Sequence, residues 1–181
     1  MTFDSSSIRQ PAKVKCRHVS STSFPVRISM NSSRPLRVAV IGSGPAGIYA
    51  SDLLMKSGRT VEIDLFEQMP APFGLIRYGV APDHPRIKGI VNSLHAVMEK
   101  PNVRFLGNIE IGTTITVEKL HEYYDAIVFA TGAVADRDLD IPGENLNGSY
   151  GAADFVGFYD GNPRFHRTWN LTATHIAIIG V

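Results

Sequence analysis

The sequence predicts an α/β fold built on a parallel sheet, and three observations within its first hundred residues predict it. An apolar strand at residues 36–41 runs directly into a G-x-G-x-x-G motif at residues 42–47. A helix-like stretch follows, and a second strand at residues 61–66 then ends in an acid, Glu67. Strand, glycine motif, helix, strand and acid in this order are the signature of a Rossmann-like dinucleotide-binding unit.

Each part of this motif has a physical role at a dinucleotide. Gly42 allows the tight turn, Gly44 lets the backbone approach the pyrophosphate, and Gly47 lets the helix pack closely on the strand. The helix N-terminus offers free N–H groups and a positive dipole end to the phosphates. Glu67 follows twenty residues after Gly47, where an acid accepts hydrogen bonds from ribose hydroxyls.

The helix between the two strands is expected to bury one apolar stripe and to stop at the glycine of Ser57-Gly58. The stripe follows the spacing i, i+4, i+7 and i+8, at Ala46, Ala50, Leu53 and Leu54. A glycine turn in an α/β protein without a ligand is the alternative. Helix, second strand and acid in register favour the ligand-binding unit.

The segment at residues 69–85 is rich in Pro and Gly yet keeps apolar and aromatic residues. This composition indicates an ordered loop around a flat ligand, or else an ordinary surface loop. A helix that stops before Pro101 should follow, because one apolar face recurs at helical spacing: Ile87, Ile90, Val91, Leu94 and Met98.

Three further strands and a helix are expected next. Residues 103–106 read as a parallel strand, and residues 108–111 alternate like a more exposed strand. Thr116 is placed to cap a helix that runs through Tyr123. The continuous apolar run at residues 126–130 predicts a central, buried strand.

Two domains are predicted after a leader. The first covers residues 34–144 and ends in an irregular segment at 141–144. The second, residues 145–181, begins with a short helix at 154–159 and a strand at 174–180 that runs into Gly180. Because a compact domain does not end at the tip of an uncovered central strand, we expect an N-terminal fragment.

Residues 1–33 are Ser-rich and carry five Lys or Arg against one Asp, whereas residues 34–181 carry thirteen basic and sixteen acidic residues. We expect this leader to be disordered. It is either an organelle transit peptide or a stretch upstream of a true start at Met30. The protein is accordingly expected in the cytoplasm, or in the mitochondrial matrix if the leader is a transit peptide.

Composition excludes several classes of protein. At 44% hydrophobic residues the chain is typical of globular proteins, and it has no apolar run of membrane-spanning length. It has no basic patch with interleaved aromatic residues, so we expect no nucleic-acid partner. Cys16 is the one cysteine, which excludes an intrachain disulfide and a dithiol relay. We expect no metal site.

Several motifs together resemble adrenodoxin-reductase-type ferredoxin–NADP⁺ reductases, and bacterial members most of all. The resemblance covers residues 35–181. The run G-V-A-P-D-H-P at residues 79–85 is the most specific motif, because the glycine motif and A-T-G are shared by many flavin enzymes. The other motifs are G-S-G-P-A-G at 42–47, P-F-G-L at 72–75, G-N at 107–108, A-T-G-A at 130–133 and I-P-G-E at 141–144.

The resemblance implies two nested Rossmann domains, with FAD on the first and NADP(H) on the second. It also implies that the FAD domain is completed by a C-terminal segment, and that electrons pass to a ferredoxin-type iron–sulfur protein. By position, the family's FAD contacts fall on Ala46, Glu67, Leu75 and Ile111. His84 matches a histidine near the flavin, which implies a catalytic role with protons or with nicotinamide placement; alternatively, His84 caps the turn before Pro85.

Two other functions remain open. A glutamate-synthase-small-subunit-like reductase also carries a run like G-L-I-R-Y-G at residues 74–79, although such subunits lack the D-H-P continuation and add cysteine clusters. The second alternative is that this chain is an inactive, truncated FAD-binding module.

Overall fold

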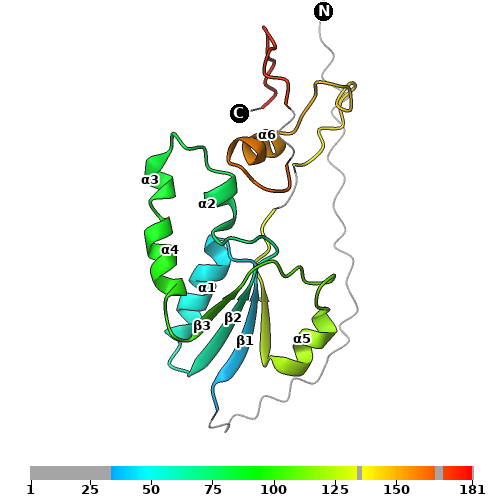
Figure 1. Ribbon diagram of the computed structural model, residues 1–181. Helices are drawn as coiled ribbons and strands as arrows, with labels where there is room; N and C mark the ends of the chain where they lie inside the picture. Colours follow the sequence, from blue (N-terminus) through cyan, green and yellow to red (C-terminus); the bar gives the residue numbers. More distant parts are fainter. Residues whose placement is uncertain (1–33, 134–135, 166–168, 181) are drawn as a thin grey trace, which may run out of the picture.

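The computed structural model describes residues 34–133, 136–165 and 169–180 (Figure 1); the predicted leader, residues 1–33, lies outside them. Its centre is a four-stranded parallel sheet in the order β3-β2-β1-β4. The strands are β1 (Leu36–Ile41), β2 (Val61–Phe66), β3 (Val103–Leu106) and β4 (Ala126–Phe129). The α/β fold with a parallel, Rossmann-like sheet is therefore confirmed.

Helices cover both faces of this sheet (Figure 1). One face is covered by α1 (Pro45–Met55) and α4 (Val91–Met98), and the other by α5 (Val117–Tyr123). The short helices α2 (Gly74–Tyr78) and α3 (Pro85–Lys88) stand above α1 and α4, and α6 (Ala152–Tyr159) lies beyond the carboxyl ends of the strands.

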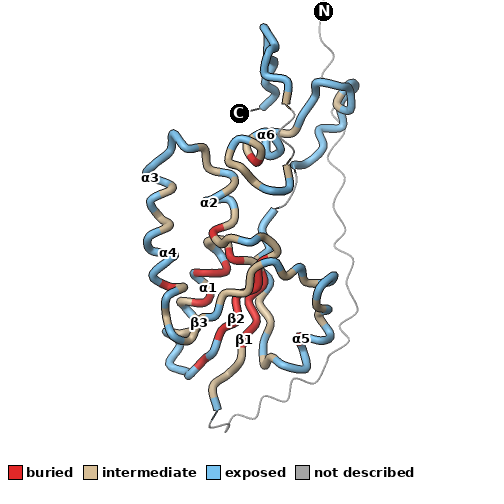
Figure 2. The backbone as a smooth tube through the Cα atoms, in the orientation of Figure 1, coloured by how far each residue is buried: buried red, intermediate tan, exposed pale blue. Residues whose placement is uncertain are grey.

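Strand alternation divides the core into two clusters. In β1, Val38 and Val40 face the cluster that includes Ile48 of α1 and Leu94 of α4. Ala39 and Ile41 face the second cluster, which is completed by Phe66 and by Leu120 of α5. Burial on both faces explains why β1 is an almost unbroken apolar run. Figure 2 shows the buried residues concentrated in β1, β2 and the start of α1.

The predicted stripe of α1 is correct at Leu54, which packs against the first core cluster, but wrong at Leu53. Leu53 is 68% exposed, and the buried residues of the helix are Gly47, Ile48 and Ser51. Two small residues on the buried face let the helix approach the sheet more closely than a leucine stripe would allow. The buried hydroxyl of Ser51 donates to the Gly47 carbonyl at 2.8 Å, so its polarity is satisfied inside the helix.

The helix predicted over residues 87–98 is interrupted. It is divided at Gly89 into α3 and α4, and Ile87 is exposed. Leu94 and Val97 are the residues of α4 that are buried. The segment at residues 69–85, predicted as a loop, contains the unpredicted helix α2.

The exposed strand predicted at residues 108–111 is absent. Asn108 has a left-handed backbone, φ +58°, which turns the chain away immediately after β3. Ile111 forms a single isolated bridge with Ile115. The following helix is confirmed, because the Thr116 hydroxyl accepts from the Lys119 N–H at 3.2 Å at the start of α5.

Strand β4 forms as predicted but is not central. Among the described strands it lies at the edge of the sheet, and Phe129 is 60% exposed. Residues 174–180 form no strand; Ile178 is 87% exposed, and none of the described strands lies beside this segment to complete its hydrogen bonds. The predicted helix at 154–159 is confirmed as α6.

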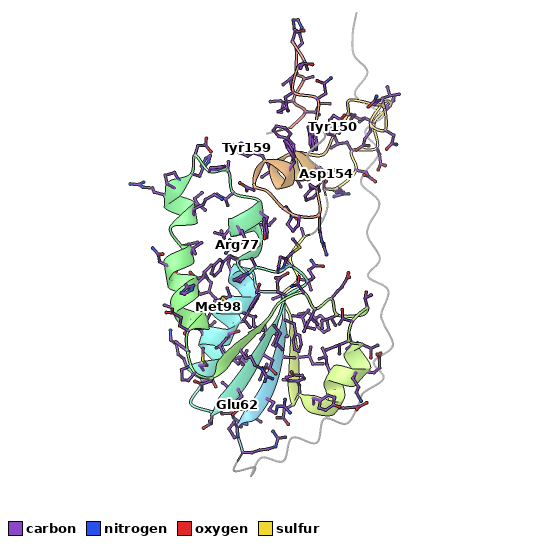
Figure 3. All side chains as sticks on the ribbon, viewed as in Figure 1. Glu62, Arg77, Met98, Tyr150, Asp154 and Tyr159 are labelled. Atoms are coloured by element: carbon purple, nitrogen blue, oxygen red, sulfur yellow. The ribbon has the colours of Figure 1, made fainter. Side chains whose placement is uncertain are left out.

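Two polar contacts connect the α6 region to α3 and to the segment that follows β2. The Lys88 Nζ atom of α3 lies 3.7 Å from Oδ1 of Asp160, whose side chain is buried. Arg164 donates a hydrogen bond to the side-chain oxygen of Gln68. Figure 3 shows Tyr150, Asp154 and Tyr159 around α6, well away from Glu62 at the opposite end of the sheet.

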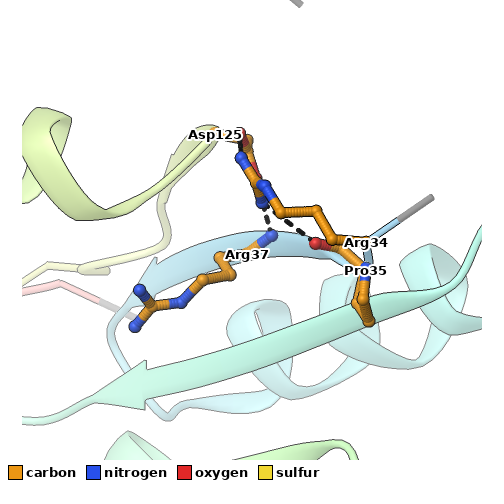
Figure 4. Close-up of polar contacts among 4 residues, drawn as sticks. All are labelled: Arg34, Pro35, Arg37 and Asp125. Atoms are coloured by element: carbon orange, nitrogen blue, oxygen red, sulfur yellow. Dashed lines mark hydrogen bonds and ion pairs between the residues drawn. The ribbon is translucent and has the colours of Figure 1, made fainter. Parts of the chain in front are cut away.

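Where the described chain enters the fold, an ion pair fixes it to the start of β4. The Arg34 guanidinium donates two hydrogen bonds to the Asp125 carboxylate, at 2.7 and 2.6 Å. The Arg37 N–H of β1 donates to the same carboxylate at 2.9 Å (Figure 4). These bonds lower the pKa of Asp125 and fix the register between β1 and β4.

A second polar cluster lies in the sheet itself, on the face covered by α5. Asp64 of β2 is buried and accepts two bonds from the Arg104 guanidinium, at 2.8 and 2.6 Å, and one from the Tyr124 hydroxyl at 2.5 Å. Burial acts to raise the pKa of Asp64, but the bonds from Arg104 and Tyr124 outweigh it, and the pKa is lowered. Burial and the bond to Asp64 raise the pKa of Tyr124 to about 12.

We predict that Asp64→Asn lowers the free energy of unfolding of the chain by about 1–3 kcal/mol, because charge-assisted hydrogen bonds to a buried group are lost. The contribution of Asp64 is complete above the ordinary aspartate pKa of 3.8 and is lost as the pH falls through the lowered value of the folded state. The difference between the wild type and the variant should therefore shrink in acid.

Urea unfolding followed by circular dichroism at several pH values measures this difference. Asp83→Asn is the control: its carboxylate is 75% exposed, so a change within about 0.5 kcal/mol is expected. Equal stability of Asp64→Asn and the wild type at pH 7 would contradict the prediction.

Candidate dinucleotide-binding site

The glycine motif forms a turn that only glycine permits at two of its three positions. Gly42 has φ +104°, and a Cβ there would lie 2.3 Å from the Ala130 carbonyl oxygen. A Cβ on Gly47 would lie 1.9 Å from the Gly42 carbonyl oxygen. The first glycine therefore makes the turn from β1 into α1, against the residue that follows β4, and the third lets α1 pack on that turn, as the motif predicts.

Gly44 differs from the other two glycines. Its backbone is extended, φ −72° and ψ 179°, and a Cβ there would meet no described atom within 4 Å. The space beside this residue is thus open, which suits close approach of a ligand to the backbone. Because the fold itself does not need glycine here, a ligand is the physical reason to have it.

The N-terminus of α1 is arranged to receive an anion. Gly44 precedes the helix, no described side chain caps it, and its first turn contains no acid. Pro45 occupies the first position, where its missing N–H costs nothing, and Ala46 follows in an exposed position. N–H groups of the first turn lack helical partners, so they are available to phosphate oxygens.

Glu67 reaches the glycine motif from the end of β2. It is 8% exposed, and its Oε2 atom accepts hydrogen bonds from both the N–H and the hydroxyl of Ser43, at 3.0 and 2.7 Å. Its Oε1 atom accepts one bond, from the Met69 N–H at 3.0 Å. A carboxylate has about four acceptor positions, so one position on Oε1 remains for a ligand hydroxyl.

A corner at Phe73-Gly74 closes over the glycine motif; the sequence predicts a loop here but not its contact with the motif. The Phe73 N–H donates to the Ser43 carbonyl at 2.9 Å, and a Cβ on Gly74 would lie 3.1 Å from the Gly44 Cα. Phe73 is buried with a left-handed backbone, φ +86°. The Arg77 guanidinium lies over its ring, 5.4 Å from the centroid, and Figure 3 shows Arg77 beside α2.

Leu75 and Ile111 belong to two different segments near this region. Leu75 follows the corner on α2, and its side chain is 59% exposed. Ile111 packs against the second core cluster. The loop that leads to it runs beside Glu67, because the Ile109 N–H donates to the Glu67 carbonyl at 2.9 Å.

His84 lies further along the chain, at the start of α3. It occupies the N-cap position of α3, as the alternative of a cap before Pro85 expects, but its side chain makes no capping hydrogen bond. Instead, its Nδ1 atom lies 2.9 Å from the Asp83 carboxylate, and the imidazole is exposed. None of its hydrogen bonds among the described residues reaches the glycine motif.

The described residues contain no group of three or more His, Cys, Asp or Glu that could hold a metal ion. No helix among them is both long enough and apolar enough to span a bilayer.

Residues 36–180 match the family described as pyridine nucleotide-disulphide oxidoreductase. The chain belongs to this family. NADPH-ferredoxin reductase FprA of Mycobacterium leprae is 44% identical over 149 residues, which is 79% of this chain and 33% of that protein. The mitochondrial NADPH:adrenodoxin oxidoreductase of Arabidopsis thaliana is 43% identical over 137 residues, which is 76% of this chain and 28% of that protein.

The fold agrees with a solved structure of the same group. Mycobacterium tuberculosis FprA in complex with NADPH superposes with a TM-score of 0.70 at 44% identity, covering 73% of this chain and 30% of that chain. These matches confirm the resemblance to adrenodoxin-reductase-type ferredoxin reductases. The chain spans about a third of the length of the curated relatives that it matches.

We predict opposite behaviour for two glycine-to-alanine variants of this loop. Gly47→Ala should lower the free energy of unfolding by about 1–3 kcal/mol, because its methyl group overpacks the contact with the Gly42 carbonyl. Gly44→Ala should change it by no more than about 0.5 kcal/mol, because the methyl group meets no described atom.

Urea unfolding of the two variants beside the wild type tests the pair. A stable Gly47→Ala protein, or a Gly44→Ala protein that is as destabilised as Gly47→Ala, would show that the close approach of α1 to the motif is not what demands glycine.

Proposed function

We propose that this protein is a flavoprotein oxidoreductase that passes electrons between NADP(H) and a ferredoxin-type iron–sulfur protein through FAD. The observation that carries the proposal is the glycine motif, in which an open backbone at Gly44, the uncapped start of α1 and the Glu67 carboxylate meet at the carboxyl ends of β1 and β2. The names of the relatives, NADPH-ferredoxin reductase and NADPH:adrenodoxin oxidoreductase, supply the reaction class.

The residues present fit the adenosine diphosphate half of FAD. The pyrophosphate would lie against Gly44 and the N–H groups at Ala46, and a ribose hydroxyl would donate to the remaining acceptor position of Glu67. A ribose 2′-phosphate would be repelled by the same carboxylate. This charge argues that the first site takes FAD and that NADP(H) binds elsewhere in the complete protein.

The surrounding residues have roles that follow from their positions. Leu75 offers an exposed apolar side chain next to the loop, suited to cover a flat ring, and the backbone at Ile111 suits the adenine. FAD would supply hydride acceptance from NADPH and one-electron release to the iron–sulfur protein. We assign His84, whose imidazole is exposed and bonded to Asp83, the task of holding or moving a proton near that reaction.

The cellular compartment belongs to the same proposal. The relatives include proteins named as mitochondrial and proteins of bacteria. We place this protein in the cytoplasm, and in the mitochondrial matrix if residues 1–33 act as a transit peptide. Imaging a fluorescent fusion with and without these residues distinguishes the two.

The full-length protein should purify with FAD, and Glu67→Ala should weaken FAD binding roughly ten- to a hundredfold, since a hydrogen bond to a charged acceptor contributes about 1.5–3 kcal/mol. Flavin absorbance and a fluorescence titration with FAD measure both effects. Glu62→Ala, on the same strand but exposed and distant from the loop, is the control. A colourless protein that takes up no FAD would refute the proposed function.

We further predict that His84→Ala in the full-length protein keeps its FAD but alters the pH profile of NADPH-dependent ferredoxin reduction. The reason is that an imidazole can accept and donate a proton, whereas a methyl group cannot. Steady-state rates from pH 5.5 to 9 measure the profile. Asp83→Asn tests the carboxylate partner, and an unchanged profile in His84→Ala would remove His84 from the reaction.

A further inference from the structure

Ser43, the second residue of the glycine motif, is held by hydrogen bonds at every polar atom that it has. Its N–H and its hydroxyl both donate to Glu67 Oε2, at 3.0 and 2.7 Å. Its carbonyl accepts from the Phe73 N–H at 2.9 Å. The residue is 0% exposed, so it exchanges none of these partners with water.

The two partners of Ser43 come from different sides of the loop. Glu67 follows β2, and Phe73 begins the corner that leads into α2. Phe73 keeps a left-handed backbone, which is unfavourable for an aromatic residue. Such a conformation persists where the surrounding structure over-determines it, and here it directs the Phe73 N–H at the Ser43 carbonyl.

The hydroxyl of Ser43 also determines what Glu67 can offer. With both Ser43 donors on Oε2, the carboxylate cannot rotate without losing a buried charge-assisted bond. The remaining acceptor position is thereby restricted to Oε1, which the Met69 N–H holds from the other side. The direction in which Glu67 accepts a ligand hydroxyl is fixed before any ligand binds.

From this geometry we infer that Ser43 is a positioning residue for the dinucleotide: its hydroxyl orients the Glu67 carboxylate toward the ribose, and its carbonyl holds the Phe73-Gly74 corner against Gly44. The inference rests on the proposed function, because it presupposes that a dinucleotide occupies the loop. Ser43 itself touches no ligand in this arrangement and acts through Glu67.

Ser43→Ala tests the inference, because it removes the hydroxyl and keeps both backbone bonds. In the full-length protein freed of flavin, the Kd for FAD should rise roughly tenfold, the order expected for one hydrogen bond to a charged group. The Kd for ADP, which carries the same ribose and pyrophosphate without a flavin, should rise by the same factor. In a Glu67→Ala background, Ser43→Ala should change both constants by less than about twofold.

Ser51→Ala is the matched control. Ser51 is also 0% exposed, but its hydroxyl bonds to the Gly47 carbonyl and not to Glu67. It should leave both constants within about twofold. Equal weakening by Ser51→Ala and Ser43→Ala, or additive effects of Ser43→Ala and Glu67→Ala, would overturn the positioning role. If the wild type takes up no FAD, the proposed function itself fails; if it binds FAD and Ser43→Ala binds equally well, only this inference fails.

Discussion

The structure depends on one steric constraint, the approach of α1 to the turn that leaves β1. A helix can begin immediately after this strand only if its third residue has no side chain, because a Cβ on Gly47 would lie 1.9 Å from the Gly42 carbonyl oxygen. That approach places the first turn of α1 over the carboxyl end of the sheet, where Glu67 follows β2 and Ala130 follows β4. The binding loop, the buried stripe of Gly47, Ile48 and Ser51, and the tight first core cluster all follow from it.

Around this constraint the loop is preorganised by polar contacts within the protein. The dinucleotide-binding motif predicts that Glu67 binds the ribose. Yet Ser43 and Met69 already use three of its roughly four acceptor positions. A buried carboxylate needs such donors in the absence of ligand, since an unpaired buried charge is costly. The same bonds that make Glu67 tolerable in the folded protein restrict it to one direction of recognition.

The sequence predicted the parts of the fold that are specified locally, and it failed where remote contacts decide. Strands β1 and β2, the capped helix α5 and the glycine turn were predictable because apolar runs, Thr116 and glycine spacing each act over a few residues. The stripe of α1 was only partly correct because Ser51 is buried although it is polar: its hydroxyl is bonded to the Gly47 carbonyl, so the polarity of this residue does not indicate its burial. The edge position of β4 depends on which strands lie beside it, and no periodicity in the sequence shows that.

Ser43 and Phe73 were missed because their partners are separated from them in sequence. The acid after β2 was the one available signal for Ser43.

The strand order has a consequence for how the protein is made. Strands β1 and β2 are close in sequence and can pair early, but β1 completes its other edge only with β4, and the bond from Arg37 to Asp125 spans 88 residues. During synthesis the glycine turn therefore emerges well before Ala130, the residue that closes around Gly42. The nascent chain must hold an open sheet edge at β1 until β4 leaves the ribosome, and contacts so distant in sequence close slowly. The emerging domain is thus most exposed to mispairing and chaperone capture in the interval between these two strands.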